Sequence, residues 1–197
     1  GAIGDGGAIL CPSDRHVARL RVDRNLGKDG KYAFGAISGN SKLDTLQAAI
    51  LDLKLRHLPQ WLRRRAAIAE RYLDELSGIR NLTLPTVDPR ARHAWHLFVV
   101  RTSSRDALAD FLAARGIKTG RHYPIAVTQQ PGLQQVLGGQ RCALAERWAA
   151  EGLTLPLSQE HTDEEIQRVV GAIRAFFDST DDHNPGISRD GSVKASD

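Results

Sequence analysis

The sequence predicts a small α+β domain, in which helices gather on one face of a short sheet, with an additional N-terminal segment attached. Two long helical patterns lie near residues 41–78 and 162–177, and short apolar runs alternate with helices between them. The chain has 197 residues, of which 41% are hydrophobic and 25% are charged. This length and composition are typical of one soluble globular domain, or of one domain and part of another.

The N-terminal segment, residues 1–39, differs in character from the rest of the chain. It opens with glycines that are too frequent for a helix interior, because glycine loses much backbone entropy there. The apolar run at residues 8–11, stopped by Pro12, predicts a short buried strand that needs partner strands. The remaining expectations are a short helix and a loop, at residues 13–22 and 23–39.

The strongest predicted element is a helix over residues 41–78. Asn40 or Ser41 is suited to cap its start, and Gly78 is suited to end it. Pro59 lies inside the pattern and removes one backbone donor, so we expect two helices or one kinked helix. The apolar stripe consists of Leu43, Leu46, Ile50, Leu53, Leu58, Leu62, Ala66, Ala69, Tyr72 and Leu76.

Short strands and helices alternate after this long helix. The run at 95–101 is rich in aromatic and β-branched residues and is apolar on both faces, which favours a covered strand. One helix is expected to end at Gly116, and another over 141–151 is expected to pack Leu144 and Trp148 against the core. The predicted strands lie at residues 81–85, 95–101, 117–119 and 153–156.

Residues 120–139 predict a long loop, and loops of this length are usually functional or mobile. A capping box from Thr162 to Glu165 predicts the start of the last helix. The tail carries five aspartates and no apolar period, so we expect it to be disordered. The expected organisation is an end of a larger domain with a connecting loop, a small α+β domain and a tail, at residues 1–39, 40–177 and 178–197.

Composition excludes several classes of function. The net charge is +4, but the basic residues are scattered, and the run at 63–65 is explained by a solvated helix face better than by a nucleic-acid surface. Cys11 and Cys142 lie too far apart for a metal or redox pair, so no metal site is expected. No apolar stretch is long enough to span a bilayer and no secretory signal is present, so a cytoplasmic location is expected.

Four segments, in order along the chain, carry a resemblance to a known family. They are residues 4–9 (GDGGAI), residues 39–51 (GNSKLDTLQAAIL), residues 95–100 (WHLFVV), and Gly116-Ile117 followed by His122-Tyr123-Pro124. The chain resembles, over about residues 1–177, the C-terminal half of the DegT/StrS-type sugar aminotransferases. The resemblance implies the small C-terminal domain of the aspartate-aminotransferase fold, with a short, mainly antiparallel sheet and a residual strand of the large domain.

The resemblance also implies an activity. Members of the family are homodimers that depend on pyridoxal 5'-phosphate (PLP), and they move an amino group, usually from glutamate, to a nucleotide-linked keto sugar. They serve surface polysaccharide or secondary-metabolite biosynthesis. The Schiff-base lysine would lie just before the residue matching Gly1, and none of the six lysines has that context. No catalytic residue is therefore assigned here, and the chain alone is expected to be inactive.

Four binding residues follow from the same resemblance. Asn40 matches a residue that reaches the PLP phosphate bound by the other subunit, and the alternative role is a helix N-cap. Lys42 stands where the family usually has arginine, so it supplies a point charge rather than a planar fork; the alternative is a solvated lysine. His122 and Tyr123 match a loop that approaches the sugar or the partner, and the alternative is a structural role in a packed loop.

Three other classes remain open on the sequence. A dehydratase relative would have a histidine in place of the Schiff-base lysine. A free-standing, non-catalytic interaction domain would bind a partner through the strand edge at residues 8–11. A basic nucleic-acid-binding module would use the scattered arginines, and its affinity would fall linearly with the logarithm of salt concentration.

Overall fold

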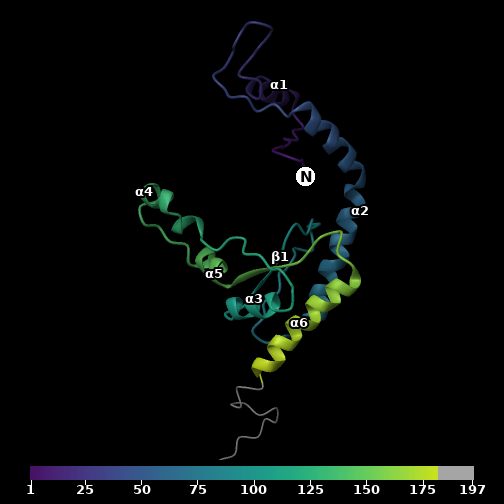
Figure 1. Ribbon diagram of the computed structural model, residues 1–197. Coiled ribbons are helices and arrows are strands. Elements are labelled where there is room, and N and C mark those ends of the chain that lie inside the picture. The colour runs from purple at the N-terminus through teal and green to yellow at the C-terminus, as the bar shows by residue number, and fades with distance from the viewer. Residues whose placement is uncertain (182–197) are drawn as a thin grey trace, which may run out of the picture. The chain divides into compact units, whose positions relative to one another are not determined.

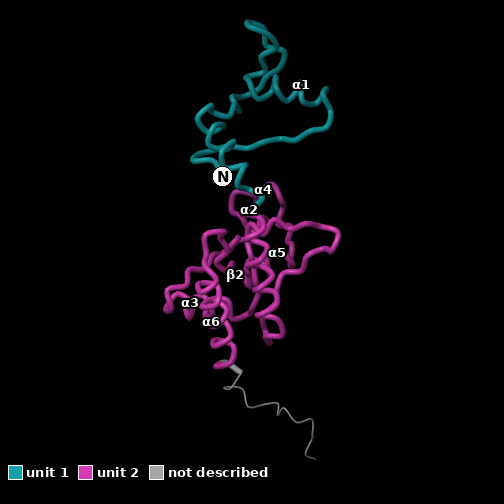
Figure 2. Tube along the Cα trace, turned by 90° about the vertical axis from the view of Figure 1, so that its right-hand side faces the viewer, with its two compact units in different colours: residues 1–60 teal, residues 61–197 magenta. Residues whose placement is uncertain are grey.

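A computed structural model of the chain describes residues 1–181 (Figure 1). The chain forms two compact units, residues 1–60 and residues 61 onward (Figure 2). The division therefore falls after Gln60, whereas the sequence places a domain boundary after Gly39. The predicted disorder of the tail lies mostly outside the described residues, but residues 178–181 belong to the last helix rather than to a disordered tail.

The first unit holds one short helix and a long irregular connection. Helix α1, Asp14–Asp23, follows Ser13, whose side chain makes no capping bond. Residues 8–11 form no strand, and Leu10 is 95% exposed, so the predicted buried strand is wrong. The reason is physical, because no neighbouring strand within this unit supplies partners for its backbone groups. The connection after α1 is held by isolated antiparallel bridges, Asn25 with Asn40 and Lys28 with Phe34.

Helix α2, Thr45–Glu75, is one continuous helix with Pro59 inside it. It begins later than the sequence indicates. The Ala48 N–H donates to the Asp44 carbonyl at 2.9 Å, so Asp44 rather than Asn40 or Ser41 precedes the first turn. Three residues of this helix, Ile68, Ala69 and Tyr72, are buried in the second unit.

The sheet of the second unit pairs β1, Phe98–Arg101, with β2, Gly152–Leu155, in antiparallel register from Phe98 opposite Leu155 to Arg101 opposite Gly152. Single bridges from Thr83 to Arg101 and from Gly120 to Thr154 add one paired residue outside each strand. The mainly antiparallel sheet of the predicted α+β fold is thus confirmed. The predicted strand at 81–85 is reduced to the bridge at Thr83, and the one predicted at 117–119 is absent, with a bridge only at the following Gly120.

Helices and sheet enclose one apolar core. Helix α3, Arg105–Ala113, packs on helix α6, Asp163–Asp181, and on β2. Figure 1 shows α6 beside the C-terminal part of α2, and Arg64 of α2 joins Asp163 of α6 at 2.8 Å. The fully buried large side chains of this core are Tyr72, Phe98, Ile68, Leu76, Leu108, Leu112, Leu153, Leu155, Ile166, Ile173, Val100 and Val170.

The arginine run at 63–65 is only partly a solvated face. Arg63 is exposed, but Arg64 and Arg65 are half-buried and bind backbone. Arg64 donates to the His161 carbonyl at 2.6 Å, and Arg65 Nε donates to the Trp95 carbonyl at 2.8 Å. These arginines therefore attach α2 to the segments that precede α6 and β1.

The connection from Gly120 to β2 contains two 3₁₀ turns, Val127–Gln129 and Pro131–Leu133, and helices α4, Gln134–Leu137, and α5, Ala143–Glu151. The expected packing of α5 is wrong, because Leu144 is 64% and Trp148 40% exposed and only Ala149 is buried. Among residues 1–181, no helix is both long and apolar enough to cross a membrane.

Candidate functional site

The segment that carries the predicted substrate-binding residues leaves the edge of β2. The Gly120 N–H donates to the Thr154 carbonyl at 3.0 Å, and the Thr154 N–H donates to the Gly120 carbonyl at 2.8 Å. This reciprocal pair is an antiparallel bridge, and it fixes the backbone two residues before His122. The geometry therefore holds the start of the segment to a buried strand of the core.

His122 is bound to the same strand through its side chain. Its Nδ1 lies 2.8 Å from Oγ1 of Thr154, and Thr154 is only 6% exposed. Tyr123 leans edge-on against the His122 ring, with ring centroids 5.4 Å apart, and is 75% exposed. The structure thus brings the two predicted residues together and leaves the phenol of Tyr123 open to solvent.

Ion pairs hold the residue between Gly120 and His122. Arg121 lies 2.8 Å from Asp106 at the start of α3, and Arg105 lies 2.8 Å from the same carboxylate. The hydrogen bond from Arg105 is the main reason that the pKa of Asp106 lies below its ordinary value. The carboxylate is therefore ionised near neutral pH and keeps both arginines as partners.

Asn40 and Lys42, the predicted phosphate-binding residues, belong to the first unit and are both exposed. The flanking backbone is fixed to the end of α1, because the Ser41 N–H donates to the Arg24 carbonyl at 2.8 Å. The Asn40 Oδ1 accepts the Lys42 N–H at 3.3 Å. This turn uses the oxygen of the amide, so Nδ2 stays available as a donor.

This donor set fits a phosphate group. Within residues 1–181 the Lys42 ammonium has no ion-pair or hydrogen-bond partner, and an amide N–H and an ammonium are each suited to phosphate oxygens. The chemistry of Asn40 and Lys42 thus fits a phosphate group such as that of PLP. His122 and Tyr123 lie in the second unit.

The other described lysines have different surroundings. Lys28 and Lys31 lie over the rings of Phe34 and Tyr32. Lys54 donates to the Gly1 carbonyl at 2.7 Å. Lys118 lines a pocket of the second unit, and Lys194 lies outside the described residues.

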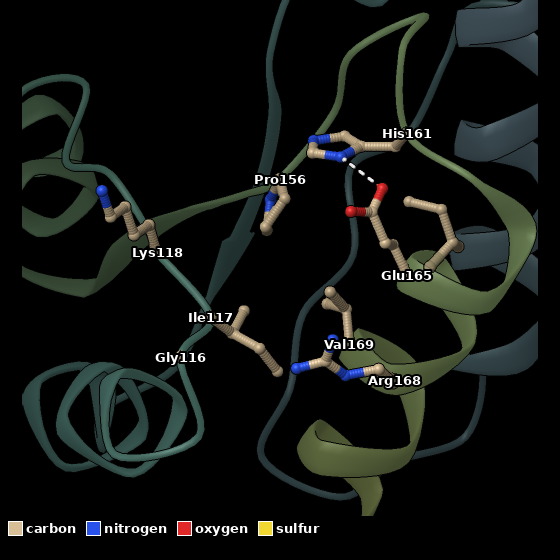
Figure 3. A pocket seen from close by; sticks show the side chains of 9 residues that line it. Gly116, Ile117, Lys118, Pro156, His161, Glu165, Arg168 and Val169 are labelled. Atoms are coloured by element: carbon tan, nitrogen blue, oxygen red, sulfur yellow. Dashed lines mark hydrogen bonds and ion pairs between the residues drawn. The ribbon is translucent and has the colours of Figure 1, made fainter.

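That pocket has a volume of about 390 Å³ and was not predicted from the sequence (Figure 3). It lies between the segment at Gly116–Lys118 and α6, with Ile117 and Val169 among its apolar lining residues. Figure 3 shows His161 and Glu165 pointing toward each other, and their Nδ1 and Oε2 atoms are 3.3 Å apart.

Glu165 is already used by the start of α6. Its carboxylate accepts the Thr162 N–H at 3.0 Å, while the Glu165 N–H donates to the Thr162 hydroxyl at 3.2 Å. The backbone hydrogen bond from Thr162, followed by the bond with His161, keeps the pKa of Glu165 below its ordinary value. This pair is thus a capping arrangement with a histidine attached.

Thr154 and Gly120 are functional candidates that sequence analysis missed. The available signal was a hydroxyl residue between two leucines in a predicted buried strand, because a buried hydroxyl requires a partner. Among residues 1–181, no group of three or more histidine, cysteine or acidic side chains is placed to bind a metal ion.

Comparison with known proteins identifies the family. The model of the DegT/DnrJ/EryC1/StrS aminotransferase family matches residues 2–174. An α+β domain with an exposed His–Tyr pair on a segment that is bridged to its sheet is consistent with the small domain of such an enzyme. The chain belongs to the DegT/DnrJ/EryC1/StrS aminotransferase family.

Individual relatives agree with this assignment. The chain is 38% identical over 182 residues to the dTDP-3-amino-3,4,6-trideoxy-alpha-D-glucose transaminase of Streptomyces venezuelae, covering 92% of this chain and 48% of that protein. It superposes on the crystal structure of S. venezuelae DesV in complex with a ketimine intermediate, with a TM-score of 0.85 and 38% identity, over 90% of this chain and 48% of that one.

A third match is the structure of NtdA from Bacillus subtilis with bound cofactor PMP, with a TM-score of 0.70 and 26% identity, over 80% of this chain and 38% of that one. The chain spans about half the length of the curated relatives that it matches.

Proposed function

We propose that this chain is the C-terminal half of a PLP-dependent aminotransferase that transfers an amino group, with glutamate as donor, to a nucleotide-linked keto sugar. The observation that carries the proposal is the 38% identity with a dTDP-amino-sugar transaminase over 92% of the chain. The curated relative reported above is named as a transaminase, which favours amino transfer over the dehydratase alternative.

When bound, PLP supplies an electron sink for the carbanion that amino transfer requires. This chain contributes to PLP binding through electrostatic contacts with the phosphate. Asn40 donates its amide N–H, and Lys42 its ammonium protons, to the phosphate oxygens. The turn closed by Asn40 Oδ1 and the Lys42 N–H, 3.3 Å apart, orients the Asn40 amide. The covalent lysine is supplied by the other half of the enzyme.

His122 and Tyr123 act on the substrate side. Both are exposed and carry polar atoms that bind sugar hydroxyl, keto or phosphate oxygens. The segment is fixed to the core by the bridge from Gly120 to Thr154 and by the ion pair from Arg121. Such anchoring lowers the entropic cost of substrate binding, because the segment that carries the two side chains is ordered before the substrate arrives.

The assembly we propose is a homodimer with its active sites at the subunit interface. Large apolar side chains are exposed in both units of the described chain, for example Leu10 at 95% and Val136 at 79%, and such surface is typical of an interface. Cytoplasmic biosynthesis of amino sugars for surface polysaccharides or secondary metabolites is part of the same proposal.

The test uses the intact protein, with the upstream half of the gene restored. Purified enzyme is incubated with glutamate and a dTDP- or UDP-linked keto hexose, and 2-oxoglutarate is measured together with the amino sugar. Formation of both products in equal amounts is expected. Loss of a sugar hydroxyl without consumption of glutamate would instead identify a dehydratase.

The phosphate contact has a matched pair of variants. Asn40→Asp keeps the oxygen that accepts the Lys42 N–H but removes the donor and adds a negative charge, whereas Asn40→Gln keeps a donor. We expect the Kd of the intact enzyme for PLP to rise at least about tenfold in Asn40→Asp, the effect of losing one charge-assisted bond. Equal PLP affinity in Asn40→Asp and the wild type would contradict the assignment.

A further inference from the structure

We propose that Thr154 is a positioning residue that holds the His122 imidazole in the Nε2–H form and so presents that N–H as a donor to an oxygen of the sugar nucleotide. The first part of the proposal, the Nε2–H form of His122, concerns this chain alone. The second part, the contact with the sugar nucleotide, rests on the proposed function. Thr154 is 6% exposed, and the other buried polar residue among residues 1–181 is Thr102, at 3%.

The proton on the imidazole follows from the needs of the buried hydroxyl. The only partner of Thr154 Oγ1 within the described chain is His122 Nδ1, at 2.8 Å. If Nδ1 carried the proton, the hydroxyl hydrogen of Thr154 would be left buried without an acceptor, which is unfavourable. The arrangement that satisfies both groups has the threonine O–H donating to a bare Nδ1. In a neutral imidazole the proton then sits on Nε2.

The backbone makes this contact possible. The bridge between Gly120 and Thr154 brings the two chain segments to hydrogen-bonding distance. A Cβ at position 120 would lie 2.8 Å from His122 Cε1, so only glycine permits the ring to lie this close to the strand. Tyr123 packs edge-on against the ring, with centroids 5.4 Å apart. The ring is thus held by a bond at Nδ1 and by ring contact, while His122 as a whole stays exposed.

This arrangement defines what the site recognises. A fixed neutral Nε2–H donates to an acceptor, so it selects ligands that place a keto, hydroxyl or phosphate oxygen there. It does not act as a base, since the available lone pair on Nδ1 is occupied by Thr154. Thr154 acts through His122 and does not itself touch the substrate.

The tautomer is tested directly by imidazole ¹⁵N NMR on the 197-residue chain, with His122→Gln used to assign the His122 signals. We expect the wild-type signals of neutral His122 to show a protonated Nε2 and a bare Nδ1. A protonated Nδ1 in the wild type would overturn the proposal, and this reading requires no variant of Thr154 to fold.

Three variants separate positioning from simple structural support. Thr154→Val removes the hydroxyl and is expected to shift the His122 signals toward a mixture of tautomers, while Thr154→Ser is expected to restore the wild-type pattern. Thr102→Val removes the other buried hydroxyl and serves as the matched control, with His122 signals unchanged. Identical His122 spectra in Thr154→Val and the wild type would refute the role of Thr154.

The second part is measured in the intact enzyme. Thr154→Val is expected to raise the KM for the keto-sugar nucleotide about five- to tenfold, the value of one hydrogen bond, with the KM for glutamate unchanged. Thr154→Ser should recover most of this loss. Amino transfer with the same sugar KM in Thr154→Val would refute positioning but not the proposed function. If the intact enzyme shows no amino transfer but the NMR signals show the predicted tautomer, the proposed function is refuted while the positioning of His122 by Thr154 stands.

Discussion

The phenol of Tyr72 offers a quantitative test of how α2 is attached to the sheet. Tyr72 is completely buried, its O–H donates to the Pro156 carbonyl at 2.8 Å, and its ring lies 5.0 Å from that of Phe98. Tyr72→Phe removes one hydrogen bond and leaves a half-buried carbonyl without its partner. A neutral hydrogen bond contributes about 1 kcal/mol to stability, and a buried polar group left without its partner costs more. We therefore expect the free energy of unfolding to fall by about 1–2 kcal/mol.

Urea unfolding followed by tryptophan fluorescence measures this loss. All three tryptophans lie after residue 60, so the signal reports on the second unit. With an m value of about 2 kcal/mol per molar urea, the midpoint should fall by about 0.5–1 M with m unchanged. Tyr123→Phe is the matched control, because its phenol is exposed, and should shift the midpoint by less than about 0.2 M. Equal midpoints in Tyr72→Phe and Tyr123→Phe would refute the reasoning.

Alkaline pH provides a second measurement on the same pair. Burial raises the pKa of Tyr72 in the folded chain, so the folded state disfavours the phenolate that the unfolded state forms above its ordinary pKa of 10.0. The wild type should therefore lose stability as pH rises past about 10, and Tyr72→Phe should lose less. Parallel losses in the two proteins would show that the phenol makes no difference.

Three further perturbations have defined outcomes. Thr162→Ala removes the capping hydroxyl from α6 and should lower the free energy of unfolding by about 1 kcal/mol in the same urea assay; no change would refute the capping role. Because the folded pKa of Glu165 is depressed, its contribution is present above its ordinary pKa of 4.5 and disappears as pH falls below it, so Glu165→Gln should flatten the acid limb of the stability curve. Gly152→Ala would place a Cβ 2.7 Å from the Trp148 carbonyl and should destabilise by about 1–3 kcal/mol, whereas Gly171→Ala, with open space around its Cβ, should be neutral or stabilising; equal effects would contradict this contrast.

The helices were the most predictable elements because their signals are local. The capping box from Thr162 to Glu165 and the apolar side of α6 are both confirmed. The strands were less predictable, because a strand exists only where a partner supplies hydrogen bonds. Residues 8–11 have the composition of a strand but no partner, and residues 81–85 are reduced to one bridge at Thr83.

In the candidate site, too, the local contacts were predictable from the sequence and the long-range contacts were not. The proximity of His122 to Tyr123 was implied by their adjacency in the chain. The bond from His122 to Thr154 was not, because it joins residues 32 positions apart through a bridge that leaves no periodic pattern. The half-buried state of Arg64 and Arg65 was likewise hidden, since their acceptors are carbonyl groups of distant loops and every residue has a carbonyl.

The choice of acceptors for these arginines determines how the domain responds to acid. Arg65 and Arg174 donate to main-chain oxygens of Trp95 and Glu75, which hold no proton in the acid range. The Glu165 carboxylate at the start of α6, by contrast, accepts the Thr162 N–H in its ionised form, and this contribution disappears as the carboxylate is protonated. Acidification should accordingly loosen the start of α6 first, while α2 stays fastened to the segment before β1 and to Arg174. A partly acidified domain would thus open from one end.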